Sequence, residues 1–390
     1  MRGRDSALAH KKECKPNMRY VFSCGGTAGH INPAIAIADR LRELDMEAEI
    51  VFIGKEGGME QRLVQRAGYP ILSLDVMGIK RSLSVSNVKA VFKAFAATRK
   101  SEKLLLSLQP DAVIGTGGYV CYPVMKAAAK MGIYTVLHES NAVPGLAVRL
   151  LKRRVSKIFV SFDKCKERLK GAKCCEVSGN PVSGFEKLSR EEARKELGID
   201  GRYKYLIVSF GGSLGAKTVN DCALKIMEEL TAKRGDIRHF HSYGRGEAER
   251  FCKAFTEKGL DKCKDITASE YIYCMPTLLK AADVVLCRSG AMTLAEIAAS
   301  GVASVLIPSP NVTANHQLEN ALALSSKNAA FTVNEKTENA EKQALHYVSE
   351  LIRNEALRNE MARNAALFGS ADAADLIAND IINNCKNKKN

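Results

Sequence analysis

Short apolar runs alternate along the chain with longer segments in which apolar residues recur every three or four positions, beginning at Met18. Four of the apolar runs predict strands, at 19–24, 48–54, 112–115 and 134–138. The periodic segments near them predict helices, at 31–44, 59–67, 124–130 and 145–151. Strands that alternate with helices form a parallel, right-handed, doubly wound sheet, which binds ligands at the carboxyl ends of its strands.

The alternation breaks at the turn-rich segment 178–182 and starts again with a helix at 190–197. Further strands are expected at 205–210, 237–242, 284–287 and 303–307, and further helices at 293–300, at 316–325 and from 338 to about 369. A last amphipathic segment covers 371–382. The restart predicts a second domain of the same α/β class.

These patterns divide the chain into four parts. Residues 1–17 carry five Lys or Arg against two acids and have no apolar core, so we expect a basic, disordered extension. Two Rossmann-like domains are expected at 18–182 and 183–368. The remaining segment, 369–390, is expected to be a helix that packs back on the first domain.

Two glycine-rich segments, at 25–30 and 211–216, each follow a predicted strand and precede a predicted helix. In such loops, backbone N–H groups and the positive end of the helix dipole face a phosphate. The first segment lacks the G-x-G-x-x-G spacing and the following acid of a dinucleotide site, which disfavours a nicotinamide cofactor. The chain is therefore expected to bind a phosphorylated ligand.

Polar residues gather where predicted strands end. His30 follows the first glycine loop, where its imidazole either acts as a base near neutral pH or only caps the helix. Asn141 follows another strand and either serves a site or caps a turn. Arg288 can meet a phosphate at a third strand end. Glu296 either accepts two hydrogen bonds from a ribose diol or is an ordinary solvated helix residue.

The composition narrows the class of partner. The net charge is +15, with 58 Lys and Arg against 43 Asp and Glu, which favours an anionic partner. The absence of Trp and an aromatic content of 6% argue against a stacking platform for nucleic acid. The 12 cysteines form no C-x-x-C pair, which indicates reduced thiols in a cytosolic protein rather than a zinc site.

A basic stretch from 79 to 103 contains seven Lys or Arg and one acid. Val88, Phe92 and Phe95 recur there at helical spacing, beside Lys89 and Lys93. A basic amphipathic helix can lie on an anionic membrane surface, although the same apolar residues would also suit a helix packed on the core. No run of about 18 apolar residues occurs, so no helix is expected to span a bilayer.

Seven motifs follow one another along the chain: GGTAGH at 25–30, GTGGYV at 115–120, HESNAVPG at 138–145, GNPV at 179–182, GGSLGA at 211–216, CRSGAMTLAEI at 287–297 and NHQ at 315–317. In this order and spacing they resemble the MurG family, the N-acetylglucosaminyltransferases of bacterial cell-wall synthesis. The resemblance covers the chain from about Met18 to near its C-terminus. It implies a GT-B architecture, in which two Rossmann-like, doubly wound parallel-sheet domains flank a cleft.

The resemblance also implies a reaction. GlcNAc would pass with inversion from UDP-GlcNAc to the C4 hydroxyl of the MurNAc sugar in undecaprenyl-pyrophosphoryl-MurNAc-pentapeptide (lipid I), which gives lipid II. The protein would be peripheral, on the cytoplasmic face of the bacterial cell membrane. Its partners would be UDP-GlcNAc, lipid I, the anionic membrane surface and other cell-wall synthesis proteins, but not nucleic acid. No cofactor or metal is implied, and the chain contains no D-x-D pair.

The family's functional residues map onto this chain by motif. The catalytic residues would be His30 and Asn141. The acceptor side would include Thr27, Gly29, Gly117, Gly118, Tyr119 and Glu139. The UDP-GlcNAc site would include Thr27, Gly29, His30, Asn141, Ser183, Ser213, Leu214, Gly215, Arg288, Gly290, Ala291, Glu296 on the ribose, and Gln317 on the GlcNAc. The membrane surface would include Ile79, Lys80, Arg81, Leu83, Lys89, Phe92 and Lys93.

Three positions depart from the family pattern. Ser183 stands where the family commonly has Arg near the diphosphate, so that charge would have to come from Lys217, Arg245 or Arg288. Ser140 replaces the usual Gln, and Tyr122 occupies a position that is usually small. These changes bear on substrate affinity more than on the type of reaction.

Two alternatives stay open. One is another GT-B enzyme, such as a transferase that glycosylates a different lipid acceptor, for example diacylglycerol, or a UDP-GlcNAc 2-epimerase. The segment 138–145 and the basic stretch argue against the epimerase. The other is a non-catalytic nucleotide- or lipid-binding relative, which the joint presence of His30, Asn141, Glu296 and Gln317 disfavours.

Overall fold

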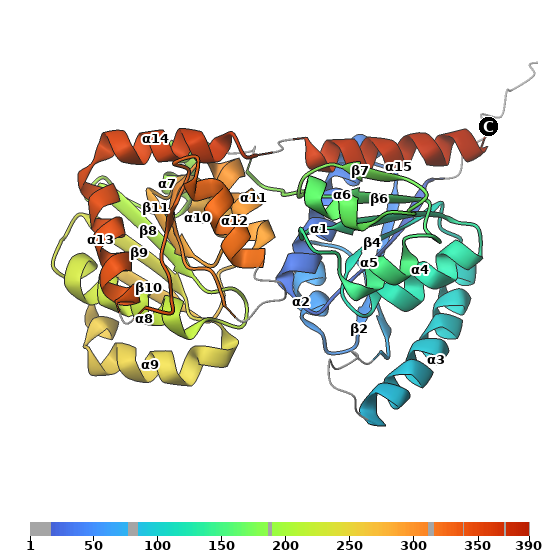
Figure 1. Ribbon diagram of the computed structural model, residues 1–390, viewed down its shortest axis with the longest axis horizontal. Helices are drawn as coiled ribbons and strands as arrows, with labels where there is room; N and C mark the ends of the chain where they lie inside the picture. Colours follow the sequence, from blue (N-terminus) through green and yellow to red (C-terminus); the bar gives the residue numbers. More distant parts are fainter. Residues whose placement is uncertain are drawn as a thin grey trace, which may run out of the picture.

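The computed structural model describes residues 17–76, 85–185, 189–310, 316–337, 339–369 and 372–389, without the side chains of 85–95, 316, 388 and 389. Two α/β domains stand side by side, each built around one parallel sheet (Figure 1). The expected extension at 1–17 lies, apart from Asn17, outside the described residues. The expected class, two doubly wound α/β domains, is confirmed.

The first sheet has seven parallel strands in the order β3-β2-β1-β4-β5-β6-β7. Their bounds are β1 (Arg19–Cys24), β2 (Glu49–Lys55), β3 (Ile71–Leu74), β4 (Ala112–Gly117), β5 (Tyr134–Glu139), β6 (Lys157–Val160) and β7 (Cys175–Val177). The order runs outward in both directions from the β1–β4 pair. Loops that leave neighbouring strands toward opposite faces open a crevice at such a switch point. The segments 25–30 and 118–120 both leave the sheet there.

Helices cover both faces of this sheet (Figure 1). They are α1 (Ala28–Leu44), α2 (Met59–Arg66), α3 (Val85–Leu108), α4 (Cys121–Lys130), α5 (Leu146–Leu151) and α6 (Asp163–Arg168). The strand side chains on one face form a core with α1, in which Phe22 and Phe52 stack with ring centroids 5.0 Å apart. Strands buried on both faces explain the continuous apolar runs in the sequence.

The second sheet repeats the arrangement with six parallel strands in the order β10-β9-β8-β11-β12-β13. Their bounds are β8 (Tyr205–Phe210), β9 (Ile237–Ser242), β10 (Ile266–Ser269), β11 (Val284–Cys287), β12 (Ala303–Leu306) and β13 (Phe331–Thr332). Its switch point lies between β8 and β11. The second glycine loop, 211–216, therefore leaves the sheet at the same topological position as the first.

The helices of the second domain are α7 (Arg190–Glu196), α8 (Lys217–Ile226), α9 (Ala248–Glu257), α10 (Met275–Ala281), α11 (Ala291–Ser300), α12 (His316–Ser325), α13 (Ala340–Arg353) and α14 (Glu355–Ala366). The helical region expected from 338 to 369 is thus two helices. They are separated at Asn354, whose side chain accepts a 3.1 Å hydrogen bond from the Leu357 N–H and caps α14.

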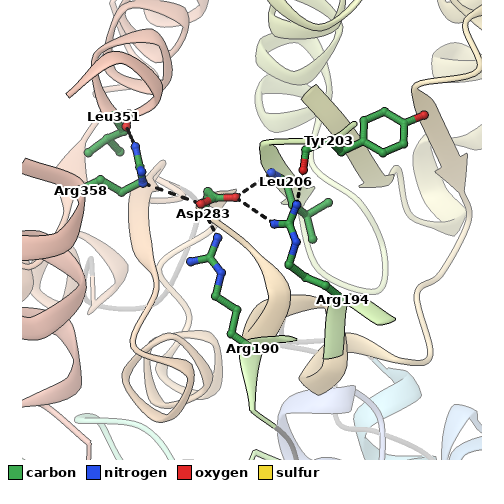
Figure 2. Close-up of polar contacts among 7 residues, drawn as sticks. All are labelled: Arg190, Arg194, Tyr203, Leu206, Asp283, Leu351 and Arg358. Carbon is green, nitrogen blue, oxygen red and sulfur yellow. Dashed lines mark hydrogen bonds and ion pairs between the residues drawn. The ribbon is translucent and has the colours of Figure 1, made fainter. Parts of the chain in front are cut away.

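One buried carboxylate ties these helices to the sheet (Figure 2). Asp283, directly before β11, is 5% exposed and accepts a 2.8 Å hydrogen bond from the Leu206 N–H of β8. It also pairs with three arginines: Arg190 and Arg194 of α7, and Arg358 of α14. Two of these arginines reach further, because Arg194 donates to the Tyr203 carbonyl and Arg358 to the Leu351 carbonyl.

The last helix, α15 (Ala373–Lys389), lies along the same edge of the molecule as α14 but packs on α1 of the first domain (Figure 1). Ile377 and Ile381 are fully buried in the first domain's core. Asp380 accepts hydrogen bonds from the Tyr134 hydroxyl at 2.7 Å and from the Lys157 ammonium at 2.6 Å. The chain therefore crosses between the domains twice.

Candidate active site

The switch points of the two sheets face a common cavity of about 480 Å³. Its lining comes from both domains and includes residues after β1, β5, β8 and β11. Of the residues expected at the site, those that line this cavity are Thr27, Gly29, His30, Asn141, Ser213, Gly290, Ala291, Glu296 and Gln317. The structure thus brings together side chains that are far apart in the sequence.

His30 lies in the first turn of α1, with its ring held by the loop that precedes it. Its Nδ1 lies 3.2 Å from the Gly25 carbonyl oxygen. A carbonyl can only accept, so Nδ1 carries the proton and Nε2 of the neutral imidazole keeps its lone pair. Within the described part of the chain, Nε2 of His30 has no hydrogen-bond partner. This tautomer is the one that a general base facing the cavity needs.

The expected acceptor-side residues Gly117 and Gly118 form the floor under this loop. A Cβ on Gly117 would lie 2.6 Å from Cδ2 of His30, and a Cβ on Gly118 would lie 2.2 Å from the Gly25 carbonyl oxygen. Both glycines also have positive φ angles, of 113° and 84°. Any side chain at either position would displace the imidazole or the peptide that holds it.

Asn141 is oriented by Glu139. One oxygen of that buried carboxylate accepts from the Asn141 N–H at 3.0 Å and from its side-chain amide at 3.1 Å. The other oxygen accepts from the Gly145 N–H at 2.7 Å. With its NH₂ group engaged, Asn141 has its Oδ1 as the atom suited to accept a hydrogen bond in the cavity. Glu139 thus shapes the 140–145 loop without lining the cavity.

Glu296 projects from α11 between this cavity and a neighbouring one of about 290 Å³. Burial raises its pKa to about 7, and a hydrogen bond from the Asn32 side chain of the first domain partly opposes that rise. A carboxylate that lies close to half-protonated at neutral pH is poised for hydroxyl donors, because they stabilise its charged form.

Gln317 stands at the start of α12, opposite the first domain. Its side-chain oxygen accepts a 2.9 Å hydrogen bond from the Ser309 N–H, and its carbonyl accepts a 2.8 Å hydrogen bond from the Ser289 hydroxyl. With Oε1 occupied, the NH₂ group is the part of this side chain that can donate to a ligand. Its neighbour in the NHQ motif, Asn315, lies outside the described residues.

Two helix N-termini point at the same cavity. Thr27, Ala28 and Gly29 at the start of α1, and Gly290 and Ala291 at the start of α11, belong to its lining. The first N–H groups of a helix have no partner within the helix and carry the positive end of its dipole. The cavity therefore offers backbone donors to an anion from both domains.

Four residues expected at the donor site do not line this cavity. Arg288 pairs with Glu335 and donates a 3.0 Å hydrogen bond to the Ile307 carbonyl, so its guanidinium is committed within the second domain. Of the three cations expected to compensate for Ser183, Arg288 therefore already has an acidic partner. Ser183 lines the neighbouring cavity. Leu214 is 65% exposed on the outside of its loop, and Gly215 packs against the Tyr243 carbonyl.

The other departures and expected acceptor and membrane residues fall in different places. Ser140 lines the cavity beside Asn141, whereas Tyr119 and Tyr122 do not line it. Lys217 and Arg245 are exposed next to the second glycine loop. Ile79, Lys80, Arg81 and Leu83 lie outside the described residues. Lys89, Phe92 and Lys93 belong to α3, but their side chains also lie outside the description.

Sequence reasoning missed several residues of the cavity. Asn32, Tyr271, Ile272, Met275 and Met292 line both this cavity and its neighbour. Tyr271 packs edge-on against Tyr273, whose ring lies 4.3 Å from the Arg66 guanidinium of the first domain. In the sequence, the one pattern that could have indicated these residues is the aromatic segment 271–273, which follows β10, a strand that the apolar pattern did not predict.

Within the described ranges, no three His, Cys, Asp or Glu side chains are grouped so that they could hold a metal ion. The same part of the chain contains no helix that is long and apolar enough to cross a membrane.

Two Rossmann-like domains around a shared cavity, with an imidazole on one side and helix N-termini on both, are typical of the GT-B architecture, which many glycosyltransferases share. The sequence agrees with that class. It matches the glycosyltransferase family 28 N-terminal domain over residues 20–160 and the glycosyltransferase family 28 C-terminal domain over residues 206–377.

The relatives define the family within that class. A Bacillus pumilus protein is 38% identical over 363 residues, which are 93% of this chain and 98% of the relative. A Bacillus subtilis protein is 37% identical over 358 residues, which are 92% of this chain and 97% of the relative. Both are named UDP-N-acetylglucosamine–N-acetylmuramyl-(pentapeptide) pyrophosphoryl-undecaprenol N-acetylglucosamine transferase. This chain belongs to that family of glycosyltransferases.

Solved structures agree with the sequence relatives. The crystal structure of Acinetobacter baumannii MurG is similar with a TM-score of 0.66 and 27% identity, over 94% of this chain and 99% of that chain. The UDP-GlcNAc 2-epimerase of Neisseria meningitidis, bound to UDP-GlcNAc, has a TM-score of 0.64 at 13% identity, over 94% and 100%. At that identity the likeness shows the fold alone. The GT-B architecture and the MurG-family resemblance are confirmed.

Proposed function

We propose that this chain transfers GlcNAc from UDP-GlcNAc to the C4 hydroxyl of the MurNAc sugar in lipid I, with inversion, and so forms lipid II. The carrying observation is the shared cavity, in which His30 and Asn141 of the first domain face Glu296 and Gln317 of the second. Membership of a family whose members are named for this transfer supports the same reaction.

On the donor side, the second domain holds UDP-GlcNAc. Glu296 accepts hydrogen bonds from the ribose diol, and the Gln317 amide donates to a GlcNAc hydroxyl. The N-termini of α1 and α11 meet the diphosphate, whose charge grows as the bond to the sugar breaks. Donors that are fixed before the reaction stabilise that growing charge without having to reorganise.

On the acceptor side, the first domain places the C4 hydroxyl near Nε2 of His30. Nε2 takes the hydroxyl proton while the oxygen attacks the anomeric carbon from the face opposite UDP. The bond to UDP breaks in the same displacement, and UDP leaves with the bonding electron pair. A single displacement converts the α-linked donor into a β-1,4-linked product. Asn141 accepts a hydrogen bond from the acceptor and orients it.

The reaction needs no metal in this proposal, because helix N-termini and backbone N–H groups meet the phosphate charge. The test uses the purified full chain, UDP-GlcNAc and a lipid I analogue in buffer with a chelator. We expect UDP release that depends on the acceptor, and a product with a β-linked GlcNAc by mass and NMR. No release with an acceptor that a control transferase uses would overturn the function. An α-linked product would overturn the single displacement, and loss of activity restored by Mg²⁺ would overturn the metal-free step.

We further propose that the first domain docks on the cytoplasmic face of the membrane, where the lipid acceptor lies. Support comes from α5, which packs on α4, which in turn packs on α3. Leu146 and Leu150 of α5 are 54% and 53% exposed, and Arg149 and Arg153 beside them are exposed as well. Exposed leucines among arginines suit an anionic lipid surface. Other cell-wall synthesis proteins stay candidate partners.

Vesicle binding tests the docking proposal. The variant Leu146→Ser/Leu150→Ser is expected to bind phosphatidylglycerol vesicles about tenfold more weakly in a sedimentation assay, because it loses apolar surface that enters the lipid. Met46→Ser is the matched control, since Met46 is 85% exposed in the same domain but follows the far end of α1. Equal binding by the double variant and the control would contradict the α5 surface.

A further inference from the structure

A second carboxylate, Glu60, lies buried beneath the loop that carries His30. It sits in the first turn of α2 and is 1% exposed. One of its oxygens accepts a 2.8 Å hydrogen bond from the Lys55 N–H, and the other accepts a 3.3 Å hydrogen bond from the Gly26 N–H. Both oxygens accept hydrogen bonds and neither donates one, as in an ionised carboxylate. The start of α2 does not by itself need a carboxylate that reaches Gly26 in another loop.

Three glycines make the space that this side chain fills. A Cβ on Gly25 would lie 2.5 Å from a Glu60 carboxylate oxygen, one on Gly54 would lie 2.6 Å from its Cγ, and one on Gly58 would lie 2.5 Å from its carboxyl carbon. Real Cβ atoms do not approach so closely, so none of these three positions can carry a side chain while Glu60 keeps its place. The glycine-rich character of these segments therefore serves Glu60 as well as any ligand.

The peptide group between Gly25 and Gly26 connects Glu60 to His30. Its N–H donates to Glu60, and its carbonyl accepts from Nδ1 of His30 at 3.2 Å. Gly118 closes the other side, because a Cβ there would lie 2.2 Å from the Gly25 oxygen. Hydrogen bonds in such a chain polarise one another, so a negative charge at one end strengthens the acceptor at the other.

We propose that Glu60 is a positioning residue of this enzyme that acts on His30 through the Gly25–Gly26 peptide. The carboxylate fixes the peptide plane and makes its carbonyl a better acceptor. That carbonyl holds the Nδ1–H tautomer of His30 and makes Nε2 more basic, as an aspartate does when it contacts an imidazole directly. This inference rests on the proposed role of His30 as the base.

Other titratable groups surround this arrangement. Cys24 lies near Glu60, and burial together with the Glu60 charge raises its pKa well above its usual value. His138 lies near His30, and burial lowers its pKa to about 4. Glu296, with a pKa near 7, lines the same cavity from the other domain. Because Glu296 titrates near neutral pH, a pH profile of activity would mix its titration with that of His30. The test must therefore observe the His30 imidazole itself.

NMR of the imidazole nitrogens provides that readout in the full chain, with the His30 signal assigned by its loss in His30→Gln. The sequence contains 7 His, which keeps the spectrum tractable. In the unmodified protein we expect the Nδ1–H tautomer. In Glu60→Gln we expect the His30 imidazole pKa to fall by about half a pH unit or more, because the negative charge is gone.

Kinetics complete the test. In Glu60→Gln, kcat should fall about tenfold, a fraction of what general-base catalysis contributes, while KM for UDP-GlcNAc stays close to that of the unmodified protein. The matched control is Gln61→Ala. Gln61 follows Glu60 on α2, but its side chain contacts the Gly57 N–H and the Ser73 hydroxyl instead. This control should change neither the His30 pKa nor kcat.

Three results would overturn the proposed coupling of Glu60 to His30 through the Gly25–Gly26 peptide, here called the relay. The first is the Nε2–H tautomer of His30 in the unmodified protein, a measurement that needs no variant. The second is an unchanged His30 pKa in folded Glu60→Gln. The third is a Glu60→Gln variant that loses UDP-GlcNAc affinity as much as it loses kcat. Failure of the proposed function looks different. If His30→Gln kept full turnover while Glu60→Gln still lowered the imidazole pKa, the relay would stand and the assignment of the base would fall.

Discussion

Glu296 illustrates how a single residue carries both a cost and a function. Its raised pKa means that ionising it in the folded protein is unfavourable at neutral pH. The folded pKa lies above the unfolded value, so its contribution to stability is full below about pH 4.5 and is lost as the pH rises through about 7. A buried carboxylate that lowers stability at working pH is expected to have a compensating role, and binding of the ribose diol is the role that we propose for Glu296.

Donor affinity should therefore depend on pH. With a pKa of about 7, Glu296 is mostly protonated at pH 6 and mostly ionised at pH 8. We expect UDP-GlcNAc to bind about tenfold more weakly at pH 6 than at pH 8 by calorimetry. UDP-GlcNAc serves better than UDP here, because its diphosphate is a diester that does not titrate in this range.

The variant Glu296→Gln provides the control for that pH dependence. It should bind UDP-GlcNAc weakly at both pH values. At pH 8, its free energy of unfolding should exceed that of the unmodified protein by about 1–3 kcal/mol in urea denaturation. Near pH 4.5 the two free energies should differ little. A variant that keeps the tenfold pH dependence would show that another group titrates.

For several single residues, the position at the cavity was predictable from the motifs, whereas their roles stay predictions. His30, Asn141, Glu296 and Gln317 all reach the cavity as expected. Arg288 does not, because a partner 47 positions later, Glu335, takes its charge, and no local pattern reveals that pairing. The role of Gly117 and Gly118 as the floor under His30 also depends on contacts between distant segments.

At the scale of elements, Asp283 shows how one side chain fixes several helices. Its carboxylate, 5% exposed, meets three arginines from α7 and α14 and a backbone N–H of β8 (Figure 2). Removing the one negative charge would leave three positive charges close together in a partly buried place. The unpaired arginine charges would lower the free energy of unfolding by more than the ion pairs of Asp283 contribute to it.

We therefore expect Asp283→Asn to lower the free energy of unfolding by about 3 kcal/mol or more in urea denaturation. Asp221→Asn is the matched control, because Asp221 pairs with Arg250 at 2.6 Å where both side chains are partly exposed. That control should cost about 1 kcal/mol or less. Similar losses for the two variants would show that the buried cluster is no more than another surface pair.

Central strands were the elements best predicted from the sequence. The bounds of β1, β8, β9 and β11 coincide with the ranges predicted for them. The strands that were missed, β3, β6, β7, β10 and β13, have four residues or fewer and mostly lie toward sheet edges. A short strand with one exposed flank has no long apolar run, because sheet pairing rather than local pattern holds it. Helices α6, α9 and α10 were not predicted.

At the scale of the whole molecule, few described contacts join the domains across the cavity. Asn32 donates to Glu296, the Arg66 guanidinium stacks on Tyr273, and the Asn180 amide lies 3.4 Å from the Ala291 carbonyl. The chain crosses between domains near 178–185 and again between α14 and α15. Tyr271 of the second domain also packs on the core of the first. A small interface of mainly polar contacts is typical of domains that shift relative to each other on binding. Sequence patterns gave two domains but not these contacts.

In the proposed function, the first domain supplies the base and the second domain holds the donor. The most direct measurement compares kcat and the Kd for UDP-GlcNAc in His30→Ala and Gln317→Ala. We predict that His30→Ala lowers kcat by about 10²–10⁴-fold with little change in Kd, whereas Gln317→Ala mainly raises Kd and KM for UDP-GlcNAc. If donor binding collapses in His30→Ala as much as turnover does, or if His30→Ala keeps its turnover, the assignment of these roles to the two domains is contradicted.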